Sequence, residues 1–400
     1  MKHKRIWPTL IAGVALAGTM ALGMLNAALA ADKGTIKIVT HSPLSGANSA
    51  LGEAIKLGAQ LALDDFGKLI TNQGFKVVLQ PEDDQANPTI GVANANRIIN
   101  DPDILGVVGH FNSGVFIPAS EVYAKVTLVA VSPANTNPTV TDRDSTRAIA
   151  NRICGRDDVQ GPVGADFVSK SLKAKKVYVV NNKTTYGAGL AAAFEEAIKK
   201  SGAQVLYSAG VDDKETDFSV VLNRAAVDKP DAIYFGGYYE QFGLLIKQAR
   251  QKKIESALIS GDGVDSADLQ KIAGAENMTK VYFTSTGVPI SMLPAAKNFA
   301  QAYKNKFKKD PEGYSAYGYD SMRVVILGIA DAIKTGGGKK PSREQVAAAV
   351  RRVNFDGLTG KIAFNSRGDI KAAKYVVVSA GPAYDKNDVI SVIATRPPHE

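Results

Sequence analysis

The chain has 400 residues, of which 45% are hydrophobic and 22% are charged, a composition typical of folded domains and not of disordered chains. This length accommodates two ordinary domains, each with its own core. The formal net charge is +9, but no basic block interleaved with aromatic residues occurs, so we expect no nucleic-acid partner. The single cysteine, Cys154, excludes an internal disulfide bond.

The first 30 residues have the pattern of a secretory signal peptide. A basic segment (1–5) precedes an apolar run (6–25), and Ala28-Leu-Ala30 fits the small-x-small cleavage pattern. The apolar run approaches the length of a membrane span, but its many small residues favour a cleaved signal over a membrane anchor. We therefore predict export to the periplasm, with a mature chain that starts at Ala31 and, without three basic residues, carries a charge of +6 (9 − 3).

Strands and helices alternate through the first part of the mature chain. Ala54, Leu57 and Leu61 recur at i, i+3 and i+7, which is helical spacing. The sequence predicts strands over Thr35–Thr40, Phe75–Gln80, Ile104–Val108 and Thr127–Val131, and helices over Gly52–Phe66, Pro88–Asn100 and Val115–Lys125. This βαβαβ order is typical of a doubly wound parallel sheet.

A second βα series begins near Gly155. Its expected strands are Lys176–Val180, Gln204–Ser208, Ala232–Phe235, Ala257–Ser260, Val281–Thr284, Gly360–Phe364 and Tyr375–Ser379. Its expected helices are Gln160–Ser171, Gly189–Ser201, Phe218–Val227, Glu240–Gln251, Asp265–Ile272, Pro294–Phe307, Ala316–Thr335 and Arg343–Val353. Two α/β units of similar size, with a cleft between them, are the architecture that this order favours.

Polar side chains follow strands in both units, where ligands bind in open parallel sheets. Ser113 and Thr136 follow strands of the first unit, and Tyr186, Tyr238 and Asp262 follow strands of the second. Ser113 lies just before a helix, whose free N–H groups suit a carboxylate; alternatively, its hydroxyl only caps that helix. Taken together, the five loops predict a site for a small ligand.

Residues for catalysis or metal binding are few. The histidines of the mature chain lie at no metal-ligand spacing, and neither a nucleophile elbow nor a P-loop occurs. Gly187–Ala192 matches G-x-G-x-x-A, with Asp212 ~20 residues further on, as in dinucleotide-binding folds. The first glycine, however, lies well beyond the strand end. We therefore expect a binding protein with no enzyme activity, cofactor or metal, and keep an exported nicotinamide-binding enzyme as the alternative.

Short motifs along nearly the whole mature chain carry a family resemblance. They are Ile38–Gly46, Glu82–Asp84 with Pro88, Gly109–Ser113, Ser132–Thr136, Asp158–Gly161, Tyr186–Gly189, Gly236–Tyr238 and Gly261–Gly263. With them the chain resembles the type I periplasmic solute-binding proteins of the leucine/isoleucine/valine-binding family, which serve ABC transporters. The resemblance implies two lobes, each a doubly wound parallel sheet, joined by three hinge crossovers. It places residues 34–154 plus 285–360 in the N-terminal lobe, and residues 155–284 plus 361–400 in the C-terminal lobe.

The resemblance also implies roles at the ligand site. Ser113 and Thr136 would hold the ligand carboxylate, and the Ala134 carbonyl and the Thr136 hydroxyl would accept from its ammonium group. Tyr186 and Tyr238 would close over the ligand, and Asp262 would pair with the ammonium. The other candidate site residues are Leu51, Phe111 and Asn135.

The prediction is a periplasmic substrate-binding protein of an ABC importer. It takes an aliphatic, branched-chain-like L-amino acid and delivers it to a membrane permease, as a monomer. Leu51 replaces an aromatic residue of the leucine binders, and their disulfide positions correspond to about Ala86 and Asn112. An amide, a urea-like compound or an aromatic acid is therefore the alternative ligand within the same fold.

Overall fold

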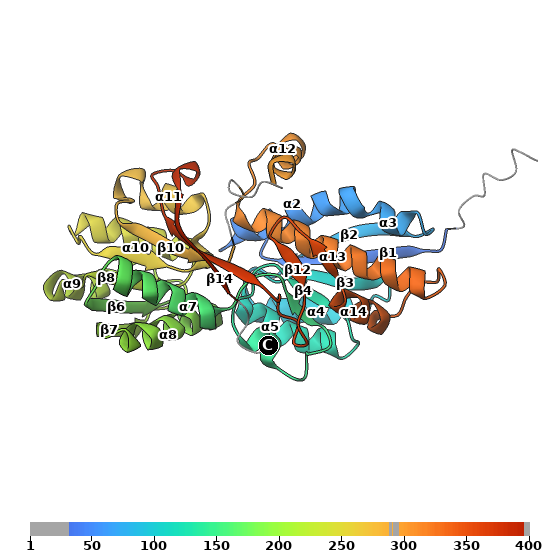
Figure 1. The fold of residues 1–400 in the computed structure, drawn as a ribbon, viewed down its shortest axis with the longest axis horizontal. Helices are drawn as coiled ribbons and strands as arrows, with labels where there is room; N and C mark the ends of the chain where they lie inside the picture. Colours follow the sequence, from blue (N-terminus) through green and yellow to red (C-terminus); the bar gives the residue numbers. More distant parts are fainter. Residues whose placement is uncertain (1–31, 288–289, 291–295, 396–400) are drawn as a thin grey trace, which may run out of the picture.

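Two sheets, each flanked by helices, form two lobes that lie side by side (Figure 1). The computed structural model describes residues 32–287, 290 and 296–395. The expected signal peptide and the first residues of the helix expected at Pro294 lie outside this range. Within it, no helix combines the length and the apolar character that a membrane crossing requires.

The N-terminal lobe contains a parallel five-stranded sheet in the order β2-β1-β3-β4-β5. Its strands are β1 (Thr35–Ser42), β2 (Lys76–Asp83), β3 (Ile104–Gly109), β4 (Ala130–Ser132) and β5 (Ala150–Arg152). All of β3 is buried, as expected for a strand covered by helices on both faces. Because β1 lies between β2 and β3, the winding direction reverses between β1 and β3.

The helices of this lobe come from two distant parts of the chain. They are α2 (Ser49–Phe66), α3 (Lys68–Thr71), α4 (Pro88–Ile99), α5 (Ser113–Ala124), α6 (Thr139–Asp142), α12 (Ala296–Phe307), α13 (Gly313–Thr335) and α14 (Arg343–Arg351). Two glycines let α13 pack closely on α2. A Cβ added at Gly58 would lie 2.0 Å from the Ser315 carbonyl oxygen, and a Cβ added at Gly318 would lie 2.3 Å from the Ile55 carbonyl oxygen.

The C-terminal lobe contains a seven-stranded sheet in the order β14-β13-β10-β9-β8-β6-β7. Its strands are β6 (Lys176–Asn181), β7 (Gln204–Gly210), β8 (Ala232–Gly236), β9 (Ala257–Ser260), β10 (Val281–Ser285), β13 (Ala373–Ser379) and β14 (Asp388–Thr395). The strands β6 to β10 are parallel, whereas β13 and β14 add an antiparallel edge. The winding direction reverses between β6 and β8.

The helical segments of the C-terminal lobe follow its strands. They are α7 (Asp157–Asp166), the π-helical turn η1 (Phe167–Ser171), α8 (Thr185–Lys200), α9 (Ser219–Asp228), α10 (Tyr239–Gln251), η2 (Asp262–Val264), α11 (Asp268–Ala273), η3 (Ala275–Asn277) and η5 (Tyr384–Lys386). Most elements expected from the sequence are present with ends shifted by a few residues. The short strands β5 and β11 (Asn354–Asp356) and the edge strand β14 were not predicted.

The chain passes between the lobes three times: after β5, after β10 and before β13. Strand β12 (Lys361–Ala363) pairs with β11 and not with the seven-stranded sheet. A lobe boundary after Ala363, and not after residue 360 as expected, agrees with this pairing.

Buried ion pairs join the first crossover to the third. Arg152 Nε lies 2.5 Å from Asp369 Oδ1, and Arg156 Nη1 lies 3.1 Å from Asp369 Oδ2. Burial alone would raise the pKa of Asp369, but the two guanidinium groups outweigh it and lower that pKa. These contacts fix the path of the chain where the lobes meet.

Candidate functional site

The reversal points of the two sheets lie opposite each other across the interlobe cleft. The backbone N–H of Asn48, in the loop after β1, donates to Glu240 Oε1 on α10 at 2.6 Å. The rings of Phe111, after β3, and Tyr238, after β8, have centroids 5.7 Å apart. The lobes are therefore closed on each other, and the predicted loops converge.

The N-terminus of α5 forms one side of the site. Ser113 is the first helical residue and is buried, and Asn112 takes the N-cap position with extended backbone angles. Helical hydrogen bonds begin at the N–H groups of Val115 and Phe116, both to the Asn112 carbonyl. The N–H groups before Val115 precede the first helical hydrogen bond, as the first N–H groups of a helix do, and they suit an incoming carboxylate. The alternative role of Ser113 as a side-chain cap is not adopted.

The loop after β4 is held against the loop after β3 by Asn135. Its side chain accepts from Ser132 Oγ at 2.7 Å and donates to the Phe111 carbonyl at 2.7 Å. Its own carbonyl accepts from Arg152 Nη1 at 3.0 Å. The polar groups of the Asn135 side chain are therefore engaged within the lobe, whereas the buried Thr136 Oγ1 has no partner among the described residues.

On the opposite lobe, Asp262 lies between two tyrosine hydroxyls. Tyr186 donates to its Oδ1 at 2.8 Å, and Tyr314, from α13, donates to its Oδ2 at 2.6 Å. Burial raises the pKa of Asp262, and the two tyrosine hydrogen bonds oppose that rise. The glycines on both sides of Asp262 let Tyr186 pack against this loop. A Cβ added at Gly263 would lie 2.8 Å from the Tyr186 ring, and a Cβ added at Gly261 would lie 2.8 Å from the Tyr186 hydroxyl. The two glycines therefore make room for Tyr186.

A second acid, Asp157, was missed in the sequence. It is the first residue of α7, it is 1% exposed, and neither of its carboxylate oxygens has a hydrogen-bond partner among the described residues. Burial and the nearby Asp262 carboxylate raise its pKa well above the usual value, against the opposing effects of the Thr136 side chain and Arg152. Two further buried atoms lack a partner there, Gln160 Oε1 and the Tyr234 hydroxyl. The helix expected from the sequence began at Gln160 and the family motif at Asp158, so neither included Asp157, and only its burial distinguishes it from Asp158.

Aromatic rings form the remaining wall. Phe111 contacts Tyr238 and Tyr314 with centroids 5.7 and 5.3 Å apart, and Tyr238 stacks on Tyr186 at 5.2 Å. Leu51 is fully buried on α2 in the same hydrophobic cluster. Tyr314 is a further residue that sequence reasoning missed, because it lies at the start of a helix, α13, and not in a loop after a strand.

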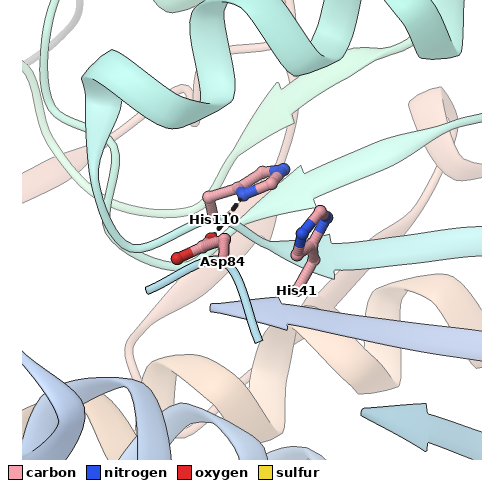
Figure 2. Close-up of side chains that lie close together, drawn as sticks. All are labelled: His41, Asp84 and His110. Atoms are coloured by element: carbon pink, nitrogen blue, oxygen red, sulfur yellow. Dashed lines mark hydrogen bonds and ion pairs between the residues drawn. The ribbon is translucent and has the colours of Figure 1, made fainter. Parts of the chain in front are cut away.

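His41, Asp84 and His110 form a buried histidine cluster at the ends of β1, β2 and β3, next to the loop that continues from His110 to Ser113 (Figure 2). Ligand-type atoms of His41, Asp84 and His110 lie within 4.8 Å of one another, a grouping that their sequence spacing did not indicate. Each ring nitrogen already has a partner. His110 contacts Asp84 at 2.7 Å and the Tyr123 hydroxyl at 3.2 Å, and His41 contacts that hydroxyl at 2.8 Å and Asn94 at 3.2 Å.

The histidine cluster therefore works as a hydrogen-bond network. A metal ion would have to displace several of these bonds. Burial and the neighbouring His110 also lower the pKa of His41 well below its usual value, so its ring is neutral at pH 7. The network joins the carboxyl ends of three strands beneath the Phe111–Ser113 loop.

The geometry defines a two-lobe binding protein, in which a small ligand would be enclosed between one lobe's helix N-terminus and the other lobe's acids. The family model described as periplasmic binding protein matches residues 35–381, so the chain belongs to that family. An amino acid binding protein of Pseudomonas aeruginosa is 34% identical, over 91% of this chain and 94% of its own length.

Solved structures agree. The leucine binding protein LivK of Thermotoga maritima has a TM-score of 0.80 at 31% identity, covering 90% of this chain and 98% of its own. A second similar structure is that of the branched-chain amino acid transporter substrate binding protein LivJ of Streptococcus pneumoniae in complex with isoleucine. It has a TM-score of 0.79 at 26% identity, and the match covers 91% of this chain and 100% of LivJ. The fold expected from the resemblance, with two sheets of mostly parallel strands, is confirmed.

Proposed function

We propose that this protein is the periplasmic substrate-binding component of an ABC importer and captures an aliphatic, branched-chain-like L-amino acid. The observation that carries the proposal is that the site combines two buried acids, Asp157 and Asp262, with the N-terminus of the helix α5. A zwitterionic head group supplies what each side lacks: a cation for the acids and an anion for the helix N–H groups.

Capture requires no chemistry on the ligand. The ligand enters between open lobes, and closure brings Asp262 and Tyr186 of one lobe against Ser113 and Thr136 of the other. Closure removes both ligand charges from water, so each needs a partner in the closed state. Similar proteins include Leu/Ile/Val-binding proteins, which supports this ligand class. Delivery to a membrane permease by a monomer completes the proposal.

The test compares two ligands of the same shape, L-leucine and its des-amino analogue 4-methylpentanoate, by calorimetry. Wild type should bind leucine. The Asp262→Asn substitution keeps the shape and removes the charge, so leucine affinity should fall roughly 10- to 150-fold. The affinity for 4-methylpentanoate should change by less than about threefold, because it has no ammonium group.

Equal losses for both ligands would show that Asp262 does not pair with an ammonium group. The proposal fails if no common L-amino acid raises the melting temperature in thermal-shift assays while amides, urea-like compounds or aromatic acids do. The alternative ligand class then replaces it.

A further inference from the structure

A polar cavity borders the head-group site. It has a volume of about 320 Å³ and lies between the lobes. The loops after β1, β3, β6 and β8, where both sheets reverse their winding, provide its inner wall. The residues of that wall are Asn48, Asn112, Asn182, Tyr238 and Glu240. Because Gly114 lines the cavity next to Ser113 and Tyr238 stacks on Tyr186, the cavity continues from the place assigned to the ligand head.

Two amide atoms on this wall have no hydrogen-bond partner among the described residues: Asn112 Oδ1, an acceptor, and Asn182 Nδ2, a donor. Both residues are at least nine-tenths buried, at 5% and 0% exposed. Leaving such groups unpaired is costly, so each calls for a partner. Both residues line the cavity, and the Asn112 side chain also lies close enough to the Tyr238 hydroxyl to affect its pKa.

The surrounding bonds fix which amide atom is which. Asn182 Oδ1 accepts from the Thr184 N–H at 3.2 Å, which no amide nitrogen can do. Asn48 donates to both oxygens of Glu240, so its Oδ1 must accept from Asn112 Nδ2, at 2.8 Å. The unpaired donor and the unpaired acceptor are therefore properties of the network and not of an arbitrary choice of amide orientation.

We infer that this cleft binds, besides aliphatic amino acids, L-amino acids with a carboxamide side chain. The ligand carbonyl accepts from Asn182 Nδ2, and the ligand NH₂ donates to Asn112 Oδ1. The exposed residues Lys183 and Asp213 lie on the solvent side of the cavity, through which the ligand side chain can be reached. The inference rests on the proposed function, since the head-group site must first hold an α-amino acid.

The experiment measures affinities for matched pairs by calorimetry. L-asparagine has the shape of L-leucine, and L-glutamine has the shape of L-homoleucine (2-amino-5-methylhexanoic acid). In wild type at least one carboxamide should bind within about tenfold of its aliphatic partner. A pocket without these amide atoms would reject a carboxamide more strongly, because its polar atoms would be buried without partners.

The decisive variant is Asn182→Asp. It keeps the acceptor that Thr184 uses and turns the free donor into an acceptor, which repels the ligand carbonyl. Carboxamide affinity should fall at least about tenfold, while leucine affinity changes by less than about threefold. The control Asn305→Asp makes the same charge change at an exposed position on α12, outside the cavity wall, and should leave every affinity unchanged.

The inference is overturned if, in both pairs, the carboxamide binds more than about 100-fold more weakly than its aliphatic partner. The proposed capture of aliphatic amino acids would still stand in that case. Carboxamide binding that Asn182→Asp does not weaken would also overturn the inference. If neither leucine nor any other L-amino acid binds wild type, the proposed function itself fails, and the inference fails with it.

Discussion

At the scale of single residues, Asp157 should destabilise the ligand-free protein and, in the complex, pair with the cationic group of the ligand. Its carboxylate is buried and lacks a hydrogen-bond partner among the described residues, next to a second acid. Burying an unpaired charge is expensive, and proteins keep such groups where a ligand supplies the partner. Asp262 differs, because each of its oxygens accepts a hydrogen bond from a tyrosine hydroxyl, although these neutral groups do not balance its charge.

The substitution Asp157→Asn should therefore act in opposite directions on stability and on binding. Without ligand at pH 7, the free energy of unfolding should rise by about 0.5–2 kcal/mol, because the variant no longer buries an acid beside the Asp262 carboxylate. Leucine affinity should fall by about tenfold or more, because the ammonium loses one of its anionic partners. Urea denaturation and calorimetry check the two effects.

The matched control is Asp158→Asn at the next position. Asp158 is partly exposed and pairs with Arg156 at 2.8 Å, so its loss should cost at most about 1 kcal/mol and leave leucine affinity unchanged. An Asp157→Asn protein that is less stable than wild type and binds leucine equally well would assign Asp157 a purely structural role.

At the scale of elements, the site depends on how loops are tied to strand ends. Asn135 joins the loops after β3 and β4, and the histidine cluster joins the ends of β1, β2 and β3. The Gly187–Ala192 motif is also explained here. An added Cβ at Gly187 would lie 2.4 Å from the Gly236 carbonyl oxygen, so this glycine allows α8 to pack against the end of β8.

Asn135→Ala should reduce both stability and affinity. The substitution leaves the Phe111 carbonyl and the Ser132 hydroxyl without their buried partner, at a cost of about 1–3 kcal/mol in unfolding free energy. The loop that carries Ser113 loses its support, so leucine affinity should also fall. The control Asn96→Ala removes an exposed bond to the Val92 carbonyl and should change stability by less than about 0.5 kcal/mol. If Asn135→Ala unfolds at the same urea midpoint as wild type, Asn135 does not hold the two loops together as proposed.

At the scale of the whole molecule, the closed state buries acidic groups where the lobes meet. Asp265, after η2, accepts from the Tyr384 hydroxyl at 2.9 Å, and that hydroxyl accepts from the Gly313 N–H of α13 at 3.1 Å. The acids that face Asp265 are Glu312 and Asp262, and no basic group contributes to its shift. Burial, opposed in part by Tyr384, raises the pKa of Asp265 to about 7.

This raised pKa gives a pH dependence of defined sign. Between about pH 4 and pH 7 the folded state holds a proton on Asp265 that the unfolded state has lost, so the contribution of Asp265 to stability falls as pH rises through this window. Asp265→Asn removes the contribution. The stability of the variant relative to wild type should therefore increase from pH 5 to pH 8, as measured by urea denaturation at both values. A difference that stays constant with pH would show that Asp265 titrates near its ordinary value.

The sequence by itself determined the class of fold and selected the candidate site residues. Alternating apolar runs and helical spacing are local properties of the chain, so most strands and helices of both lobes were predictable within a few residues. The rule that ligands bind beyond the carboxyl ends of parallel strands selected Ser113, Thr136, Tyr186, Tyr238 and Asp262, and all five are buried where the lobes meet. Their roles in binding remain predictions.

Only the tertiary structure decided which polar groups are left without partners. The sequence shows Asp157 beside Asp158, and burial alone separates the unpaired acid from the one that pairs with Arg156. Tyr314 reaches Asp262 from a helix about 50 residues away in sequence, and Asn112 and Asn182 line one cavity from different lobes. The strand β14, with its exposed Val392, was missed because an edge strand buries little apolar surface. Burial and pairing depend on contacts between distant segments, and no local pattern records them.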